Sequence, residues 1–315
     1  MRIASAIHNG FLGLLVMGMF ASAPLGADDA KPAQDEILLI HDLRYREGPL
    51  NNWTLDLAMP KGEAGKPRPA IVVIHGGGWI QGDKSSFSRP QNLPPGNILD
   101  FARQGYVAAT INYRLSDEAI FPAALHDCKN AVRYLRAHAA QYGIDPERIG
   151  AWGNSAGGHL ALMLGLVDAS AKLEGDGPYL EQSSLVQAVV SDSGPIDLLH
   201  QYEHDQVRSV IGKFLGGPPE GERIADYKLA SPINFISSKT PPILLIYGVA
   251  DEQVGVETAD QFVVALNKAG RQDVSYIRLA EVGHCPYSLK GVDLVPPVVN
   301  DFFARTLRLR EPKAP

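Results

Sequence analysis

Gly153-Asn-Ser-Ala-Gly157 joins an apolar strand pattern over 148–152 to a small-residue helical pattern over 156–166, and this stretch decides the fold. It matches G-x-S-x-G, in which a serine stands on a sharp turn between a strand and a helix. The glycines are needed because that turn strains the serine backbone and leaves no room for larger neighbours. A chance match in a glycine-rich loop is the alternative, and the flanking patterns argue against it. Ser155 is therefore the candidate nucleophile.

Strand and helix patterns alternate on both sides of this turn. The run Ala70-Ile-Val-Val-Ile74 is apolar throughout, which is typical of a strand buried on both faces of a parallel sheet. Further strands are expected at 106–112, 148–152, 186–190, 242–247 and 274–279, and helices at 98–104, 122–142, 156–166, 258–269 and 295–307. The alternation predicts a mostly parallel central sheet flanked by helices on both faces.

Two segments depart from this rhythm. Residues 36–45 and 53–59 read as extended, and the second alternates apolar and polar residues, which predicts a half-buried edge strand. Residues 197–239 are too long for an ordinary crossover and contain a helical pattern near 205–215. We interpret 197–239 as a small cap-like insertion over the active-site end of the sheet.

The first 27 residues have the layout of a secretory signal. Arg2 precedes an apolar run over 11–20, and small residues lead to Ala27. The run is too short to span a bilayer, so cleavage after Ala27 is predicted, with a retained N-terminal anchor as the alternative. Residues 28–315 are then a single mature domain, secreted or periplasmic, without membrane contact after cleavage.

Composition limits the classes of partner. The chain of 315 residues is 45% hydrophobic and has a formal net charge of −6, which argues against nucleic acid or an anionic membrane. Its two cysteines, Cys128 and Cys285, are too few for a disulfide framework or a cysteine metal cluster. We expect no metal and no organic cofactor. Composition defines no oligomeric state and no pairing of the two thiols.

A second motif supplies backbone donors. His75-Gly-Gly-Gly-Trp79 directly follows the apolar strand at 70–74. Preorganised N–H groups aimed at a developing oxyanion are each worth about 3 kcal/mol of transition-state stabilisation. We assign this oxyanion hole to the N–H groups of Gly77, Gly78 and Ala156. A phosphate-binding loop is the alternative, but no Lys-Ser/Thr pair completes it.

The base and the acid should follow the serine in the order Ser, acid, His. His284 comes just after the last predicted strand, whereas the other later histidines fall on helices or in the insertion. Asp251 follows the strand at 242–247 at its carboxyl end, where the sites of open α/β sheets lie. Asp192 is the main alternative acid, and Glu252 and Asp197 are also near suitable strand ends. The acid would hold the imidazole in its catalytic tautomer.

From about Trp53 onward the chain resembles α/β-hydrolase esterases of the bacterial feruloyl and acetyl-xylan esterase type, which are related to the hormone-sensitive-lipase-like esterases. The motifs that carry the resemblance are His75-Gly-Gly-Gly-Trp79, Gly82-Asp-Lys84, Asn112-Tyr-Arg114, Phe121-Pro122, Asp127, Asp145-Pro-Glu-Arg148, Gly153 to Ala161, Gly194-Pro-Ile-Asp197 and Ala230-Ser-Pro232. Three positions depart from the family pattern: Tyr247, Gly255 and Cys285. The resemblance implies the α/β-hydrolase fold.

The motifs and the resemblance together predict an exported serine esterase that works through a Ser155-His284-Asp251 triad and an acyl-enzyme. The resemblance implies acetyl or feruloyl esters of plant cell-wall polysaccharide as substrates. An aryl formamidase-type amide hydrolase and a non-catalytic binding protein on a hydrolase fold are the alternatives. Trp79 and Tyr287 are candidate substrate-binding residues, with packing as the alternative role. Phe87, Tyr202 and Phe214 are further candidates with the same alternative.

Overall fold

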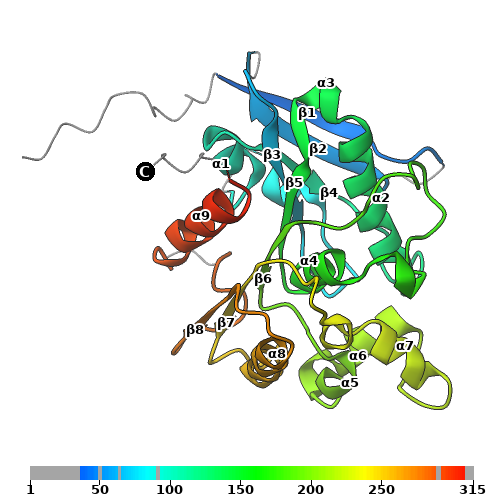
Figure 1. Ribbon diagram of the computed structural model, residues 1–315. Helices are drawn as coiled ribbons and strands as arrows, with labels where there is room; N and C mark the ends of the chain where they lie inside the picture. Colours follow the sequence, from blue (N-terminus) through cyan, green and yellow to red (C-terminus); the bar gives the residue numbers. More distant parts are fainter. Residues whose placement is uncertain (1–35, 49–51, 63–64, 90–92, 289–291, 309–315) are drawn as a thin grey trace, which may run out of the picture. The chain divides into compact units, whose positions relative to one another are not determined.

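One eight-stranded sheet runs through the part of the chain that the computed structural model describes, residues 36–48, 52–62, 65–89, 93–288 and 292–308 (Figure 1). The strand order is β1-β2-β4-β3-β5-β6-β7-β8. β2 pairs antiparallel with β1 and β4, and all later neighbours pair in parallel. The strands are β1 (Ile37–Arg44), β2 (Thr54–Pro60), β3 (Arg68–Ile74), β4 (Val107–Ile111), β5 (Ile144–Asn154), β6 (Ala188–Asp192), β7 (Ile243–Gly248) and β8 (Val274–Leu279).

Helices cover both faces of this sheet, as the alternating pattern predicts. α1 and α9 lie on one side, and α2, α4 and α8 pack on the other (Figure 1). The α-helices are α1 (Ile98–Arg103), α2 (Ala123–Ala137), α3 (Ala139–Tyr142), α4 (Ala156–Leu166), α5 (Leu198–Gln201), α6 (Asp205–Leu215), α7 (Arg223–Leu229), α8 (Val256–Lys268) and α9 (Val295–Thr306). Short 3-10 turns are η2 (Lys84–Phe87), η3 (Ala169–Ala171) and η4 (Pro232–Phe235).

The central strand β3 shows why its sequence is apolar without interruption. Val72 and Ile74 point into the core on the α2 and α4 side, while Ile71 and Val73 point into the core on the α1 and α9 side. Every residue of the strand after Arg68 is therefore buried, whichever face it occupies. The fold class predicted from the alternating pattern is confirmed.

The prediction of a half-buried edge strand at 53–59 is wrong. β2 lies between β1 and β4, and β1 forms the edge instead. The polar residue that suggested a solvent-facing side, Asp56, is fully buried. Its carboxylate is paired with Lys84 at 2.9 Å and accepts a hydrogen bond from the Ser88 hydroxyl at 2.6 Å. An aspartate in an alternating sequence looks the same whether its side chain faces solvent or is buried with all its partners, which explains the error.

The single helix expected at 122–142 is instead two helices, α2 and α3, separated at His138. The second ends at Gly143 in the left-handed conformation, where glycine carries no steric penalty. The helix expected near 205–215 is α6, with the same bounds. β5 begins four residues before the predicted strand and continues to the serine turn.

Residues 198–235 form α5, α6, α7 and η4 between β6 and β7. They pack at the carboxyl end of the sheet: a side chain placed on Gly78 would meet Val210 of α6 at 2.7 Å. The Ser231 hydroxyl accepts a hydrogen bond from the Leu198 N–H at 2.9 Å, which closes the segment on itself.

The predicted signal peptide, residues 1–27, lies outside the described residues. Within the described ranges, no helix combines the length and the apolar character that crossing a membrane requires.

A buried ion pair ties the N-terminal strands to α2. Asp127 is fully buried and accepts hydrogen bonds from the Arg114 side chain at 2.8 and 2.9 Å and from the Arg114 N–H at 2.9 Å. Its Oδ1 also accepts from the Trp53 indole N–H at 3.1 Å. Removing one partner of such a network leaves the other buried and unsatisfied.

We therefore expect Asp127→Ala to lower the free energy of unfolding by about 3–5 kcal/mol, because it strands the Arg114 guanidinium and the Trp53 N–H. Asp176→Ala is the matched control, since Asp176 pairs with Arg46 but is 81% exposed. Its loss should cost about 1 kcal/mol or less. Urea denaturation measures both, and equal losses in the two variants would contradict the proposed role of the buried pair.

Candidate active site

Ser155 stands on the turn between β5 and α4 in a strained backbone conformation, with φ of 53° and ψ of −123°. The turn is held by close packing. A Cβ on Gly157 would lie 2.0 Å from the Ile74 carbonyl oxygen, so only glycine lets α4 approach β3 this closely. The Ser155 N–H donates to the Asp192 carbonyl at 2.7 Å. Neighbouring strands thus fix the serine at the carboxyl edge of the sheet.

The glycine loop after β3 lies directly beside this turn. A Cβ on Gly76 would meet the Ser155 Cβ at 3.2 Å, and Gly77 and Gly78 have φ of 105° and 61°. The N–H groups of Gly77, Gly78 and Ala156 donate to no acceptor within the described part of the chain. Backbone donors left free next to a strained serine are what an oxyanion hole requires.

His75 stabilises that loop through a hydrogen bond and a stacking contact on Tyr113. Its Nδ1–H donates to the Gly76 carbonyl at 2.8 Å, and its ring stacks on Tyr113 at 4.4 Å between centroids. The Tyr113 hydroxyl donates to the His75 carbonyl at 2.9 Å. Burial lowers the pKa of His75, so the ring is neutral and keeps its donor role.

His284 and Asp251 meet across the carboxyl edge of the sheet. His284 Nδ1 lies 2.7 Å from Asp251 Oδ2, and Oδ1 accepts from the N–H groups of Gln253 and Val254, both at 2.9 Å. Burial acts to raise the pKa of the Asp251 carboxyl, but the hydrogen bonds from His284 and from these two amides outweigh it and leave the pKa below its usual value. An ionised Asp251 makes Nδ1 the protonated nitrogen, which leaves Nε2 of His284 free to act as a base.

The loop that carries His284 contacts the serine turn through the next residue. Burial raises the pKa of the Cys285 thiol well above its usual value, although hydrogen bonds from the Ser155 N–H and the Asn154 side chain act to lower it. Among the described residues no hydrogen bond joins Ser155 Oγ to His284 Nε2. Such bonds are commonly long until substrate binds. A buried, neutral thiol of this kind packs beside the histidine and is not activated as a second nucleophile.

Asp192, the alternative acid, has a different task. Its carboxylate accepts hydrogen bonds from the N–H groups of Tyr287 and Ser288 at 3.1 and 3.2 Å and from the Ser288 hydroxyl at 3.0 Å. Burial raises the pKa of Asp192 to about 7, against the lowering effect of these bonds. Asp192 therefore anchors the segment just after His284, whereas Asp251 contacts the imidazole itself.

The other acid candidates lie elsewhere. Asp197 caps α5, where its side chain accepts from the N–H groups of Leu199 and His200. Glu252 is exposed. Among the described residues, neither Asp197 nor Glu252 is hydrogen-bonded to His284.

Both predicted substrate-binding aromatics are buried in the protein interior. Trp79 stacks on Phe214 at 4.4 Å between centroids and is 2% exposed. Tyr287 packs on Trp152 in the core that faces α1 and α9, as Phe87 does. These positions favour the packing alternative for Tyr287 and Phe87. Trp79 is the last residue of the glycine loop, and its buried ring packs on Phe214 and donates to His159, which holds the loop against the core.

His159 has a role that its sequence position conceals. Its Nε2 donates to the Ala230 carbonyl at 2.7 Å and its Nδ1 accepts from the Trp79 indole N–H at 3.3 Å. Burial lowers the pKa of His159 to about 4, which keeps the ring neutral so that one nitrogen donates and the other accepts. The residue thus joins α4, the oxyanion loop and the segment 198–235.

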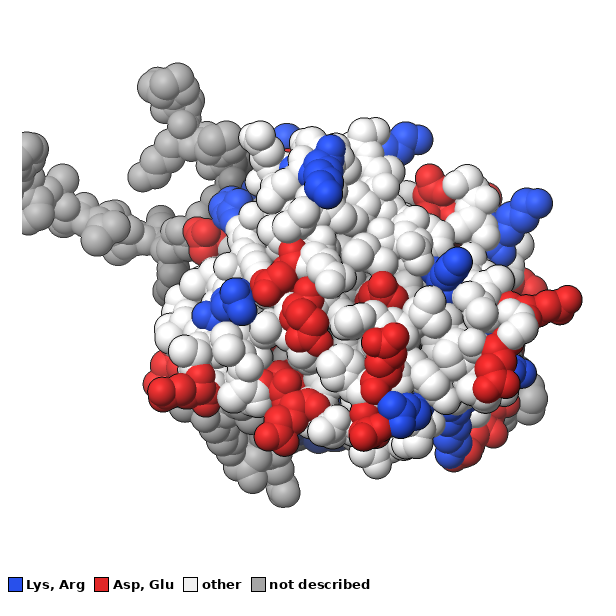
Figure 2. Space-filling model, turned by 90° about the horizontal axis from the view of Figure 1, so that it is seen from below, with Lys and Arg blue, Asp and Glu red and all other residues white. Residues whose placement is uncertain are grey.

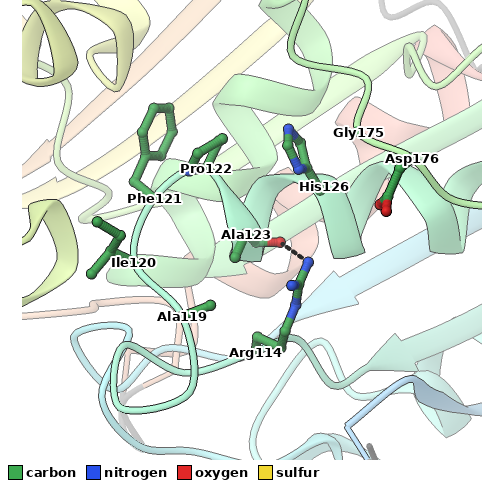
Figure 3. A pocket seen from close by; sticks show the side chains of 9 residues that line it. All are labelled: Arg114, Ala119, Ile120, Phe121, Pro122, Ala123, His126, Gly175 and Asp176. Carbon is green, nitrogen blue, oxygen red and sulfur yellow. Dashed lines mark hydrogen bonds between the residues drawn. The ribbon is translucent and has the colours of Figure 1, made fainter. Parts of the chain in front are cut away.

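A separate surface hollow of about 580 Å³ opens beside the start of α2 (Figure 3). Arg114, Ile120, His126 and Asp176 are among its lining residues, and the Arg114 side chain donates to the Ala123 carbonyl there at 3.3 Å. Ser155, Asp251 and His284 do not line it.

The sheet order, the strained serine between β5 and α4, and the histidine–carboxylate pair on the loops after β7 and β8 define an α/β-hydrolase. A family model described as BD-FAE matches residues 55–266, which is more than half of the chain. The chain therefore belongs to the BD-FAE family.

Relatives and solved structures agree with this assignment. The chain is 30% identical to the probable carboxylic ester hydrolase LipM of Mycobacterium tuberculosis, over 69% of this chain and 49% of LipM. It spans about half the length of the curated relatives it matches. A truncated carbohydrate esterase from gut microbiota superposes with a TM-score of 0.75 at 30% identity, over 88% of this chain and 99% of that one. An acetyl ester-xyloside bifunctional hydrolase from Caldicellulosiruptor lactoaceticus gives 0.65 at 28% identity, over 80% and 88%.

The two carboxylates can be distinguished by substitution. We expect Asp251→Asn to lower kcat for a short p-nitrophenyl ester by about 10⁴-fold, because the amide no longer holds the Nδ1–H tautomer. Asp192→Asn should retain far more activity, since it perturbs only the anchoring of residues 287–288. Steady-state kinetics on folded variants measures this. A larger loss in Asp192→Asn than in Asp251→Asn would assign the acid to Asp192.

Proposed function

We propose that this protein is an exported serine esterase that cleaves carboxylic esters through an acyl-enzyme. The observation that carries the proposal is the 2.7 Å contact between His284 Nδ1 and Asp251 Oδ2. The next residue on this loop, Cys285, has its Sγ 3.9 Å from the Asp192 carbonyl, which also accepts a hydrogen bond from the Ser155 N–H at 2.7 Å. The names of LipM and of the structurally similar esterases support the same reaction class.

The first step forms the acyl-enzyme. Ser155 Oγ attacks the ester carbonyl while His284 Nε2 takes its proton, and Asp251 stabilises the resulting imidazolium. The N–H groups of Gly77, Gly78 and Ala156 hold the oxyanion. When the tetrahedral intermediate collapses, the C–O bond to the alcohol breaks and the imidazolium returns its proton to the departing alkoxide.

Water completes the cycle by the same route. His284 Nε2 removes a proton from the water as its oxygen bonds to the acyl carbon, and the proton then passes to Ser155 Oγ as the acyl–serine bond breaks. The carboxylic acid leaves and the resting serine is restored. Each proton transfer uses the same imidazole, so the orientation imposed by Asp251 serves both halves of the reaction.

Acetyl esters of plant cell-wall polysaccharide are the substrates that we favour, with feruloyl esters as the other cell-wall class. The related hydrolase from Caldicellulosiruptor lactoaceticus is described as acting on acetyl ester and xyloside. Space beside the oxyanion loop is also narrow here: Val210 lies against Gly78, and the neighbouring Trp79 and Phe214 rings are stacked and buried. Crowding at that position favours a short acyl group.

A fluorophosphonate probe tests the nucleophile directly. We expect wild-type protein to be labelled and Ser155→Ala to lose labelling completely, because the probe bonds to an activated serine. Ser170→Ala is the control, since Ser170 lies in the exposed turn η3 outside the triad, and this variant should label as wild type. Folded wild-type protein that takes up no label would support a non-catalytic binding protein instead.

A substrate panel tests the ester class. We expect release of acetate from acetylated xylan and hydrolysis of p-nitrophenyl acetate, with slower cleavage of methyl ferulate and of long-chain esters. Hydrolysis of p-nitrophenyl esters without action on acetylated xylan or methyl ferulate would reject the polysaccharide proposal. Preferential cleavage of a formylated aryl amine would favour the amide hydrolase.

Export is proposed from residues 1–27 alone. The apolar run and the small residues up to Ala27 predict that the protein recovered from the periplasm or medium of a bacterial host begins at Asp28. Intact-mass measurement checks this. A recovered chain that still carries residues 1–27 would contradict cleavage and support a retained anchor.

A further inference from the structure

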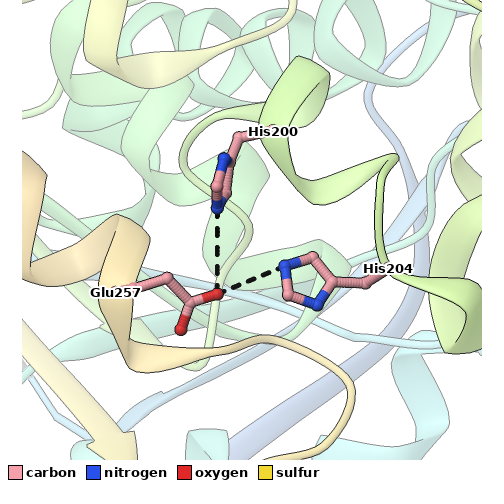
Figure 4. A group of neighbouring side chains, drawn as sticks. All are labelled: His200, His204 and Glu257. Atoms are coloured by element: carbon pink, nitrogen blue, oxygen red, sulfur yellow. Dashed lines mark ion pairs between the residues drawn. The ribbon is translucent and has the colours of Figure 1, made fainter.

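His200, His204 and Glu257 gather outside the candidate active site (Figure 4). His200 is on α5, His204 immediately precedes α6, and Glu257 lies in the first turn of α8. His204 Nε2 lies 3.3 Å from Glu257 Oε1, and His200 Nε2 lies 4.0 Å from the same oxygen. One ligand atom from each residue falls within 4.8 Å of the other two.

We propose that these three residues bind a divalent first-row transition metal, with zinc as the best fit. Two imidazole nitrogens and one carboxylate oxygen form a common zinc ligand set, completed by water at the fourth position. Zn–N and Zn–O bonds of about 2.0–2.2 Å place the donor atoms of a tetrahedral site roughly 3.3 Å apart. The His204–Glu257 distance already has this value, and the His200 imidazole, 4.0 Å from the same oxygen, would move closer on binding.

The carboxylate provides an independent indication. Glu257 Oε1 faces both imidazoles, is itself shielded from solvent in a side chain that is 43% exposed, and receives no hydrogen bond from the described residues. A buried oxygen without a donor is unfavourable, and a coordinated cation would satisfy it. The other ring nitrogen of His200, Nδ1, lies 4.0 Å from Glu203 Oε2. In metal sites a carboxylate commonly accepts a hydrogen bond from the second nitrogen of a ligating histidine, and Glu203 would reach His200 Nδ1 only by moving about 1 Å closer.

The surroundings also favour a cation. The face that carries α5 to α8 turns toward the viewer in Figure 2, where acidic side chains are spread over much of the surface. Glu203 and Asp205 are 75% and 84% exposed, and Asp260 is 41% exposed. Two cations neighbour these carboxylates: Arg208 is paired with Asp205 at 2.5 Å and Arg278 with Asp260 at 3.6 Å, whereas Glu203 and Glu257 have no Lys or Arg partner among the described residues. An excess of negative charge raises the local concentration of divalent ions.

The location of the site links it to the candidate acid. Gln201, which follows His200, donates from its side-chain amide to the Gln253 carbonyl at 2.7 Å, and the Gln253 N–H donates to Asp251. A metal bound to both α5–α6 and α8 would therefore fix the segment 198–235 against the loop that holds Asp251. Any effect on activity rests on the proposed function, whereas metal binding itself does not.

Isothermal titration calorimetry of the metal-free mature protein with zinc sulfate tests the site, and scanning calorimetry with and without zinc measures the change in Tm. We expect one zinc per chain and a rise in Tm that EDTA reverses. His204→Ala and Glu257→Gln should each weaken zinc binding by at least about 100-fold, since each removes one of three protein ligands. Asp205→Asn removes an adjacent exposed charge and should change the affinity by less than about threefold.

Two features keep the test decisive. Glu257→Gln preserves size, and the His204 side chain makes no capping hydrogen bond to α6, so both variants should fold, which circular dichroism checks. Ser155→Ala should bind zinc as wild type does, so failure of the esterase proposal is separable from failure of this one. Absence of zinc binding, or affinity unchanged in both ligand variants, would overturn the proposal.

Discussion

The close approach of α4 to β3 is the constraint on which the rest of the site depends. Gly157 packs so near the Ile74 carbonyl that any side chain would clash with backbone, and this packing holds Ser155 in its strained left-handed turn. A serine in this position projects from the sheet edge and leaves the Ala156 N–H without an intrahelical partner. Nucleophile and oxyanion donor thus arise from one packing contact, which a parallel sheet covered by helices can maintain rigidly.

The remaining groups converge because they follow strands that end at the same edge. The glycine loop follows β3, Asp251 follows β7 and His284 follows β8. Buried polar contacts then set their orientation: the Asp192 carboxylate anchors the segment after His284, and neutral His159 joins the oxyanion loop to the segment 198–235. Neither residue needs to touch a substrate for its loss to disturb the geometry, because each fixes a loop that carries a reacting group.

The sequence predicted those elements whose structure depends on neighbouring residues alone. The strand β3, the helix α4 and the turn at Ser155 follow from apolar runs and from glycine spacing. Long-range contacts could not be inferred in the same way. Asp56 reads as solvent-facing, yet in the interior Lys84 neutralises its charge and the Ser88 hydroxyl donates a hydrogen bond to it. Asp192 reads as a possible catalytic acid, although its hydrogen-bond donors come from residues 287–288. The grouping of His200 and His204 with Glu257 likewise depends on how α5 and α8 pack, which no spacing along the chain encodes.

The most direct test of the account is a crystal structure of the adduct formed with a fluorophosphonate. The account predicts a bond from phosphorus to Ser155 Oγ, the phosphonyl oxygen about 2.7–3.1 Å from the N–H groups of Gly77, Gly78 and Ala156, and His284 Nε2 within hydrogen-bonding distance of the serine oxygen. An adduct on another residue, or a phosphonyl oxygen turned away from the glycine loop, would contradict it.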